Sequence, residues 1–410
     1  MNFLKKYKNF FSDMILNMIG FGIYIISQQI ILLPILAKNV DDSIYSSLVL
    51  YLSILNLVCN VTGGELGNVR IIRDSEYKEK NVMGDFSRIM LVLAPIITVI
   101  TFPILVYLKY SFVGSIFLIL TMLMANIRLY SSCYFRLEQK YIKVIIQNLF
   151  YLCGIVISLI VYKFIQNLYL VMFIPEVVSV IYSLINSDIL HMGLTKTIQM
   201  VSTIKKFFQL GFVSLLTNLM SYFDKFLIYP MFGAGLVSVY YAVNSVSKIA
   251  NLITNPMSNV ILSWVSNAKN QDSKKKIIKL TLISNIPILL VVTVVTVPLT
   301  YIALRILYSQ YMESAQILII PIALTTAFGT ATALIKSVLL KYSNTNKLVI
   351  TYIMYFSVFG VTAYFLSKSN GILGFTIANL ISQILLWSWF ILLLLTAKED
   401  VNINKTQENV

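Results

Sequence analysis

The chain has little charge and few of the residues from which catalytic and metal sites are built. Only 12% of its 410 residues are charged, and it contains one histidine and three cysteines. Because charged residues make up about a quarter of soluble domains, a soluble globular protein is excluded. Cys59, Cys133 and Cys153 show no paired spacing, so we expect buried small side chains and no disulfide or metal framework.

Enzyme motifs are also missing. The sequence has no HExxH, GxSxG or Walker loop. The longest expected extracytoplasmic connection, near 304–314, is only about a dozen residues. A membrane glycosyltransferase or polymerase is therefore poorly supported, and no cofactor is expected. A transporter fits better.

Long apolar runs dominate the sequence, of which 58% is hydrophobic. A helix that crosses the hydrocarbon core needs about 20 such residues, which predicts an all-α integral membrane protein. We read Asp13 to Leu36 as an uncleaved first span, because it is too long for a signal peptide. Hydropathy and polar breaks predict twelve spans, near 13–36, 44–66, 86–108, 112–134, 144–162, 168–190, 207–230, 237–262, 280–303, 315–340, 348–367 and 372–396.

The distribution of basic residues sets the orientation. With the N-terminus in the cytoplasm, 23 lysines and arginines fall in inside segments and five in outside segments. This positive-inside bias predicts that both termini are cytoplasmic. It also accounts for the net charge of +15, so we expect contact with anionic membrane lipids and no nucleic-acid binding.

The two halves of the chain look related. Pro34, Tyr45 and Gln28-Gln29 lie 196 residues before Pro230, Tyr241 and Asp224-Lys225. A six-span repeat predicts two six-helix lobes around a central cavity, related by an axis along the membrane normal. The expected divisions are an N-terminal lobe 1–190, a cytoplasmic linker 191–206, a C-terminal lobe 207–396 and a polar tail 397–410.

A polar stripe in the eighth span suggests what the cavity is for. Asn244, Lys248, Asn251, Asn255 and Asn259 step by four, three, four and four residues, which places them on one helix face. Lys248 lies about 16 Å into the span. A charge facing lipid at that depth costs about 3 to more than 10 kcal/mol. The stripe must therefore face protein or a water-filled cavity.

Other early spans of each half carry polar faces as well. Span 7 offers Asp224 and Lys225, span 1 offers Gln28, and span 2 offers Asn56 and Asn60. These residues could line the same cavity. The alternatives are that the asparagines hold neighbouring helices together, that Asp224 and Lys225 form an ion pair, and that Lys248 pairs with Glu176 or Asp224.

The remaining intramembrane charges are more ambiguous. Glu176 in span 6 is equally consistent with an ion site and with a partner for another helix. We expect Arg128 and Lys336, near cytoplasmic ends of spans, to snorkel to the surface. Lys225 and Lys248 without matching carboxylates predict an electropositive cavity. That charge favours an anionic ligand such as a pyrophosphate, and asparagines suit sugar hydroxyls.

The stretch SYFDKFLIYPMFGAGLVSVYYAV (221–243) resembles the start of the second half of bacterial polysaccharide flippases of the Wzx type. These flippases belong to the multidrug/oligosaccharidyl-lipid/polysaccharide exporter (MOP) superfamily. LRILYSQYMESAQILIIPIAL (304–324) resembles the flippase family's link between spans 9 and 10, and GILGFTIANLISQ (371–383) its last span. GGELGNVRIIRD (63–74) resembles its span 2 exit, with Arg70 at a usually basic position.

The resemblance implies flipping of undecaprenyl-pyrophosphate-linked O-antigen or capsule repeat units across the bacterial inner membrane by alternating access. Arg70 joins Lys248, Lys225, Asn244, Asn251, Asn255, Asn56, Asn60 and Gln28 as expected substrate-binding residues. Ion-gradient coupling, by protons or sodium, would fall to Asp224 and Glu176. Expected partners are the lipid-linked oligosaccharide, a polysaccharide polymerase and a chain-length regulator. A drug/cation antiporter of the same superfamily is the main alternative, and a polymerase the weaker one.

Overall fold

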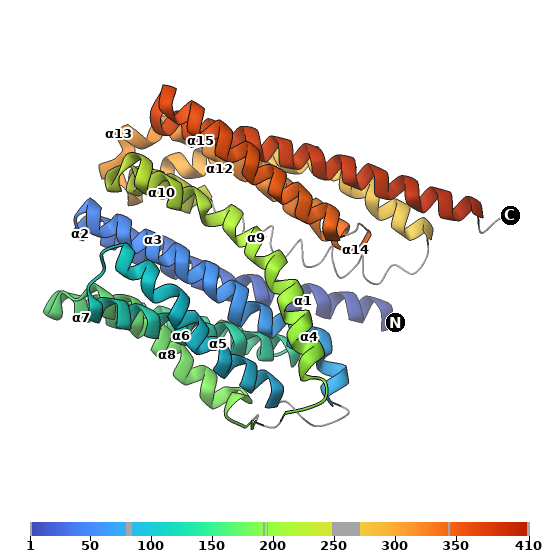
Figure 1. The fold of residues 1–410 in the computed structure, drawn as a ribbon, viewed down its shortest axis with the longest axis horizontal. Helices are drawn as coiled ribbons and strands as arrows, with labels where there is room; N and C mark the ends of the chain where they lie inside the picture. The colour runs from blue at the N-terminus through green and yellow to red at the C-terminus, as the bar shows by residue number, and fades with distance from the viewer. Residues whose placement is uncertain are drawn as a thin grey trace. The chain divides into compact units, whose positions relative to one another are not determined.

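The computed structural model describes residues 2–78, 84–191, 193–194, 196–247, 271–342 and 345–407. Within these ranges the regular secondary structure is entirely helical (Figure 1). The chain divides into two compact units. The first contains Met1–Leu33 and Ser47–Phe223, and the second contains Pro34–Ser46 and Asp224–Val410. The short corner between the first two predicted spans thus groups with the second unit.

Nine described segments are long and apolar enough to cross a membrane. Six of them coincide with predicted spans 1 to 6, and two with spans 9 and 10. The ninth, Lys347–Thr396, covers spans 11 and 12. Its backbone breaks at Asn370 and at Gly371, whose φ of +57° is a left-handed conformation that glycine adopts without strain. Part of predicted span 8 lies outside the described residues, so the count of twelve remains a prediction.

The helices of the first unit pack along one another, and helix α5 lies beside α6. They are α1 (Asn2–Ile25), α3 (Asp42–Cys59), α4 (Glu65–Lys78), α5 (Gly84–Tyr107), α6 (Phe112–Leu137), α7 (Tyr141–Ile165) and α8 (Leu168–Asn186). Helix α7 packs on α1 and α8, and α6 packs on α4, α5 and α8. A short helix, η3 (Ile189–His191), follows α8.

The second unit contains both short helices and the two longest described ones, α12 (Gln271–Leu307) and α15 (Thr345–Gln407). Its other helices are α2 (Leu33–Asn39), α10 (Ala234–Ser247), η5 (Ser309–Tyr311), α13 (Met312–Ala315), η6 (Gln316–Leu318) and α14 (Ile319–Tyr342). Helix α9 (Met200–Phe232) starts inside the predicted linker and crosses from the first unit into the second. Helix α15 continues through the predicted tail to Gln407. Helix α14 packs on α12 and α15.

Two segments are π-helical, at Ile26–Leu32 (η1) and Asn60–Gly64 (η2). Single π turns inside α-helices are rare and occur often at functional sites. The predicted site residues Gln28 and Asn60 fall in these two segments. Both spans therefore depart from regular α-helix where the sequence places polar groups.

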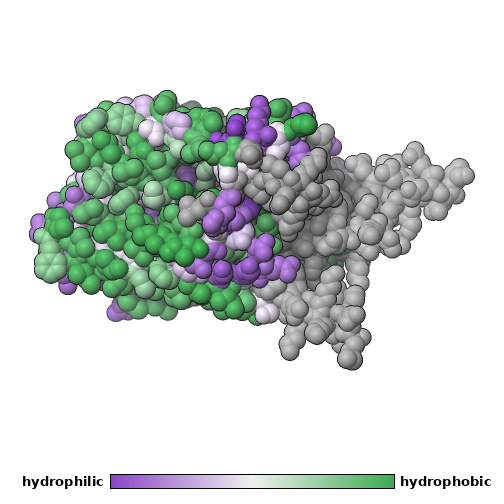
Figure 2. Space-filling model, turned by 90° about the horizontal axis from the view of Figure 1, so that it is seen from below, coloured by the Kyte–Doolittle hydropathy of each residue, from purple (hydrophilic) through white to green (hydrophobic). Residues whose placement is uncertain are grey.

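The surface of the described residues matches a membrane environment. Hydrophobic residues cover most of the face shown in Figure 2, and α5 turns Leu91, Val99 and Ile100 outward with 57–71% of each residue exposed. In water such a surface would be an aggregation liability, whereas lipid accommodates it. Cys59 and Cys133 are buried as expected, but Cys153 is exposed on α7. A lipid-facing thiol is compatible with the weak polarity of cysteine.

Small residues let helices approach closely in the first unit. A Cβ atom on Gly67 would lie 2.1 Å from the Cys133 Sγ atom, and one on Gly63 would lie 2.6 Å from the Asn126 carbonyl oxygen. Asn126 and Cys133 both belong to α6, so the two glycines face the same neighbouring helix. This is the small-xxx-small contact of membrane helices.

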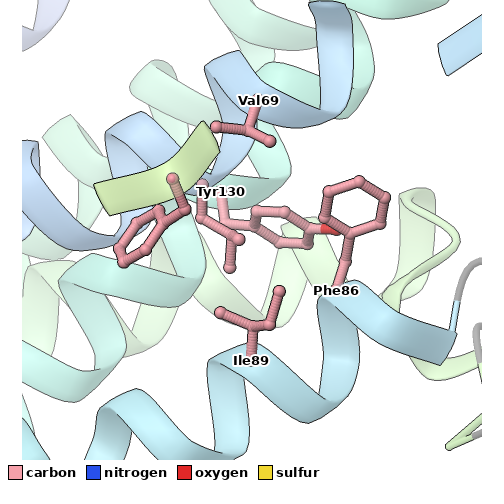
Figure 3. Packing of buried hydrophobic residues seen from close by; sticks show 6 residues of the cluster. Val69, Phe86, Ile89 and Tyr130 are labelled. Carbon is pink, nitrogen blue, oxygen red and sulfur yellow. The ribbon is translucent and has the colours of Figure 1, made fainter. Parts of the chain in front are cut away.

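An apolar cluster lies near the end of the first unit predicted to be cytoplasmic. Figure 3 shows Val69 of α4, Phe86 and Ile89 of α5 and Tyr130 of α6 packed together, with Leu66 and Phe207 completing the cluster. Their burial joins α4, α5, α6 and the start of α9. This cluster fixes the position of Arg70, which follows Val69 in the chain.

Candidate functional site

The second unit holds a buried polar network centred on the Asp224 carboxylate. Lys225 donates to its Oδ1 atom from both its backbone nitrogen, at 2.9 Å, and its Nζ atom, at 2.8 Å. Tyr240 Oη donates to Oδ2 at 2.7 Å, and Asn244 Nδ2 donates to the same atom at 3.0 Å. Four donors therefore converge on one carboxylate contributed by α9, three of them from side chains on α9 and α10.

The network continues to the last helix. Asn379 Nδ2 on α15 donates to Tyr240 Oη at 3.5 Å, and Tyr355 Oη donates to Asn379 Oδ1 at 3.2 Å. Asp224, Lys225 and Tyr240 are each at most 6% exposed. Inside a low-dielectric interior such hydrogen bonds are strong and mutually dependent. A change in the charge of Asp224 would therefore be felt on α9, α10 and α15 together.

These contacts change the electrostatic expectation for this span. The prediction that Lys225 has no matching carboxylate is wrong, because its ammonium group is fully buried against Asp224. The alternative, an ion pair between neighbours, is confirmed. Lys248, Asn251 and Asn255 lie outside the described residues, so their roles remain predictions. In the polar stripe of the eighth predicted span, Lys248 would have to supply any excess positive charge.

The first unit holds a second buried ion pair. Arg128 Nε on α6 lies 2.7 Å from Glu176 Oε2 on α8, and its Nη2 atom lies 3.2 Å from Oε1. The guanidinium carbon also sits 4.5 Å from the ring centroid of Tyr24 and 5.1 Å from that of Tyr151. This is a forked ion pair with two cation–π contacts.

The buried pair revises two expectations. Arg128 is only 4% exposed and does not snorkel, because the carboxylate and the two aromatic rings replace water around it. Glu176 serves as the partner of another helix, which was one of its two interpretations. Sequence analysis missed this pairing because the partners are 48 residues apart and the order of helix packing was unknown.

The predicted site residues of the first two spans are not joined in one network by the hydrogen bonds described for them. Asn60 Nδ2 donates to Asn218 Oδ1 on α9 at 3.0 Å, which fits an asparagine bridge between helices. Gln28 is buried and Asn56 is partly buried. The structure therefore brings Asn60 together with Asn218, a residue that sequence analysis did not select.

Arg70 is held at the end of the first unit. It forms a two-pronged ion pair with Asp188, in which Nη1 lies 3.1 Å from Oδ1 and Nη2 contacts Oδ2. Its Nη1 atom also donates to Tyr130 Oη at 3.2 Å, and its guanidinium lies 5.3 Å from the ring centroid of Tyr134. These contacts tie α4 to α6 and to the chain after α8.

Sequence analysis also missed Tyr240, although a signal was present. It lies four residues before Asn244, so the two side chains share a helix face. Asn379 carried no comparable signal.

Within the described residues, no group of three or more histidine, cysteine, aspartate or glutamate side chains is placed to hold a metal ion. The ionisable groups of the two networks are instead arranged as acid–base pairs. Such pairs can bind or release a proton, or a substrate charge, when one partner moves away.

Comparison with known proteins was informative only at the level of structure. No family model and no curated protein matches the sequence. The eukaryotic MATE transporter AtDTX14 has a TM-score of 0.68 at 14% identity, covering 98% of this chain and 100% of that one. The lipid II flippase MurJ in its inward closed conformation has a TM-score of 0.63 at 13% identity, covering 97% of this chain and 90% of that one.

The chain has the fold of the MOP superfamily. An outward-facing multidrug-resistance MATE transporter of this superfamily also matches, with a TM-score of 0.67 at 14% identity and 95% coverage of both chains. The fold expected from sequence is therefore supported, whereas the Wzx-type family is not distinguished from its relatives.

Proposed function

We propose that the chain is a flippase that moves undecaprenyl-pyrophosphate-linked oligosaccharide repeat units from the cytoplasmic to the periplasmic leaflet of the bacterial inner membrane. Its product would serve O-antigen, lipopolysaccharide or capsule biosynthesis. A polysaccharide polymerase and a chain-length regulator would act beside it. Movement between inward-open and outward-open states would carry the headgroup across.

One observation favours this function over export of cationic drugs. The two carboxylates that lie buried within predicted spans 6 and 7, Glu176 and Asp224, are each paired with a basic partner. A cation-binding cavity needs negative charge that is open to the ligand. With both acids paired, Lys248 would leave the interior positive and suited to a pyrophosphate.

Different residues would bind different parts of the substrate headgroup. Lys248 would meet the pyrophosphate, while Asn244, Asn251 and Asn255 would offer amide donors and acceptors to sugar hydroxyls. Asn56, Asn60 and Gln28 would contribute from the other half. Asp224 would couple transport to an ion gradient by exchanging Lys225 for a proton or a sodium ion.

A drug/cation antiporter is the second candidate, because MATE transporters are among the structures that this chain resembles. An antiporter for cationic drugs would need a negatively charged interior. The ion pairs would therefore have to open to expose Glu176 or Asp224 to the drug. A polymerase is a weaker candidate. It would leave single repeat units at the cell surface when deleted, whereas loss of a flippase leaves none.

The deciding experiment uses a bacterial strain that lacks its own flippase and makes the matching repeat unit. Expression of this chain should restore surface polysaccharide, measured by gel profile and surface staining. An inactive control expressed at the same level should not. Failure to restore any polysaccharide, together with a raised tolerance of cationic drugs, would replace the flippase by the antiporter.

A further inference from the structure

The first unit contains a cavity of about 500 Å³ between α5 and α6, which we call the α5–α6 groove. Its walls include Leu93, Ala94 and Ile97 of α5 and Leu123 and Ile127 of α6, and Ile189, Gly193 and Leu194 complete the lining. Ten of its fourteen lining residues are aliphatic side chains or methionine. Pockets of this size hold a drug-sized ligand or part of a longer one.

Two of the three polar side chains that line the groove, Asn126 and Tyr130, have hydrogen-bond partners within the protein. Asn126 Oδ1 accepts a hydrogen bond from the Gly63 backbone nitrogen at 2.8 Å, and its Nδ2 atom donates to the Met122 carbonyl at 3.0 Å. Tyr130 Oη accepts from Arg70. A polar solute would lose its bonds to water here without replacement. The groove therefore suits a hydrocarbon chain.

The back of the groove is packed against the apolar cluster, and its mouth is exposed. Tyr130 belongs to the cluster in Figure 3, and Met90 and Leu93 pack against that cluster. At the mouth, Leu91 is 60% exposed and Leu194 is 54% exposed. Leu91 both lines the groove and lies within about a quarter turn of Val99 on α5, which we assign to the lipid-facing side. A chain could thus enter the groove sideways from the bilayer.

A basic group stands at the same mouth. Arg88, one residue after the lining residue Ser87, donates from Nε to the Leu194 carbonyl oxygen. This bond uses one of the five donors of a guanidinium and holds its charge beside the opening. Lys196 follows two residues after Leu194. Asp85, the nearby carboxylate, is buried and accepts from the Thr197 backbone nitrogen at 2.8 Å.

We propose that the α5–α6 groove holds the isoprenoid chain of a polyprenyl diphosphate lipid, with its phosphates at Arg88. This inference rests on the proposed function, since it assigns a binding site to the carrier of that cargo. Apolar burial alone gives little selectivity between a protein groove and lipid tails. Selection comes instead from charge at the mouth. A diphosphate presents more negative charge and more acceptor oxygens to a guanidinium than the single phosphate of a phospholipid does.

The test uses the full chain in nanodiscs and undecaprenyl diphosphate that carries a diazirine on its isoprenoid chain. After irradiation, labelled peptides should map to residues 87–97 and 123–127. Ala94→Trp fills the groove and should abolish this labelling. Val99→Trp, on the lipid-facing side of the same helix, should retain it.

A second variant tests the mouth and does not depend on the packing of Ala94→Trp. Arg88→Gln should reduce labelling by the diphosphate probe to the level given by a diazirine probe of undecaprenol, which has no phosphate. Labelling that is unchanged in Ala94→Trp, or that maps elsewhere in the wild-type chain, would overturn the proposal. Equal displacement by excess phosphatidylglycerol would also overturn it, because the occupant would then be an ordinary phospholipid.

The outcome is separable from that of the proposed function. If the chain restores surface polysaccharide but the groove is not labelled, the flippase stands and this site is wrong. If the groove is labelled but no polysaccharide is restored, the lipid site stands and the transport assignment is wrong.

Discussion

Tyr45 and Tyr241 lie edge to face, with ring centroids 6.4 Å apart and ring planes at 76°. They are the residues that the 196-residue offset between the halves matches to each other. Tyr45 also stacks on Tyr311, with ring centroids 6.5 Å apart. The 34–46 corner comes from the first half of the sequence, yet these aromatic contacts build it into the second unit.

The first prediction concerns this corner. Tyr311 Oη donates to the Asp42 carboxylate at 2.5 Å, and Gln310 Nε2 donates to the Ala37 carbonyl at 3.1 Å. A hydrogen bond to a charged group contributes about 1.5–3 kcal/mol. Tyr311→Phe should therefore loosen the corner and raise the labelling rate of a cysteine at Ala37 by about tenfold or more.

The labelling uses a membrane-impermeant maleimide on cells whose chain has lost its three native cysteines. Tyr364→Phe is the matched control, because Tyr364 is 62% exposed. Equal labelling in the two variants would mean that the Asp42 contact does not hold the corner.

The second prediction concerns the Arg128–Glu176 pair. Removing one partner leaves the other buried and uncompensated, which costs about 3–5 kcal/mol. Glu176→Gln and Arg128→Gln should each lower the unfolding temperature in detergent strongly, and the double variant should lose less than the sum. In contrast, Glu138→Gln breaks a pair with Lys140 whose members are 34% and 49% exposed, and should change stability by about 1 kcal/mol or less. Additive losses in the double variant would argue against coupling.

The third prediction concerns packing at Gly67. Gly67→Ala would place a methyl group against Cys133, and overpacking of this kind costs about 1–3 kcal/mol. Cys133→Gly in the same chain should recover part of the loss. Gly22→Ala should not destabilise, since a Cβ atom added there would meet no atom within 4 Å outside the local helix backbone. Thermal unfolding of the purified chains gives all three values, and a tolerated Gly67→Ala would contradict the close approach of α4 to α6.

The fourth prediction concerns the polar stripe. Lys248→Ala should impair surface polysaccharide in the complementation strain, whereas Lys248→Arg should retain much of it because the charge remains. Lys336→Ala should be mild; Lys336 lies on α14 with its Nζ atom 6.0 Å from the ring centroid of Tyr352. Protein levels must match between variants. Wild-type output from Lys248→Ala would remove this lysine from the mechanism.

Hydropathy predicted the nine described segments that are long and apolar enough to cross a membrane, because a run of about 20 apolar residues has few other uses. Predicted span 7, which lies in α9, is not among those nine segments. Partners were harder to predict. Asp224 and Lys225 are adjacent, so their pairing could be weighed from the sequence alone. Arg128 and Glu176 meet only because α6 packs on α8, and nothing in their spacing encodes that packing.

The π-helical segments show a further limit. A regular wheel assumes 3.6 residues per turn, whereas each π turn inserts extra chain and rotates everything beyond it. Wheels drawn through Gln28 or across Asn60 therefore misplace the residues on the far side. The sequence therefore shows which residues of the first two spans are polar, but not the direction in which their side chains point.

The two buried ion pairs also differ in when they can form during synthesis. Asp224 and Lys225 leave the ribosome together, so their charges cancel before α9 meets the bilayer. Arg128 emerges 48 residues ahead of Glu176, and α6 must wait through all of α7 for its counterion. A nascent chain that stops before α8 leaves Arg128 without its carboxylate partner. We expect such a chain to be recognised by membrane protein quality control.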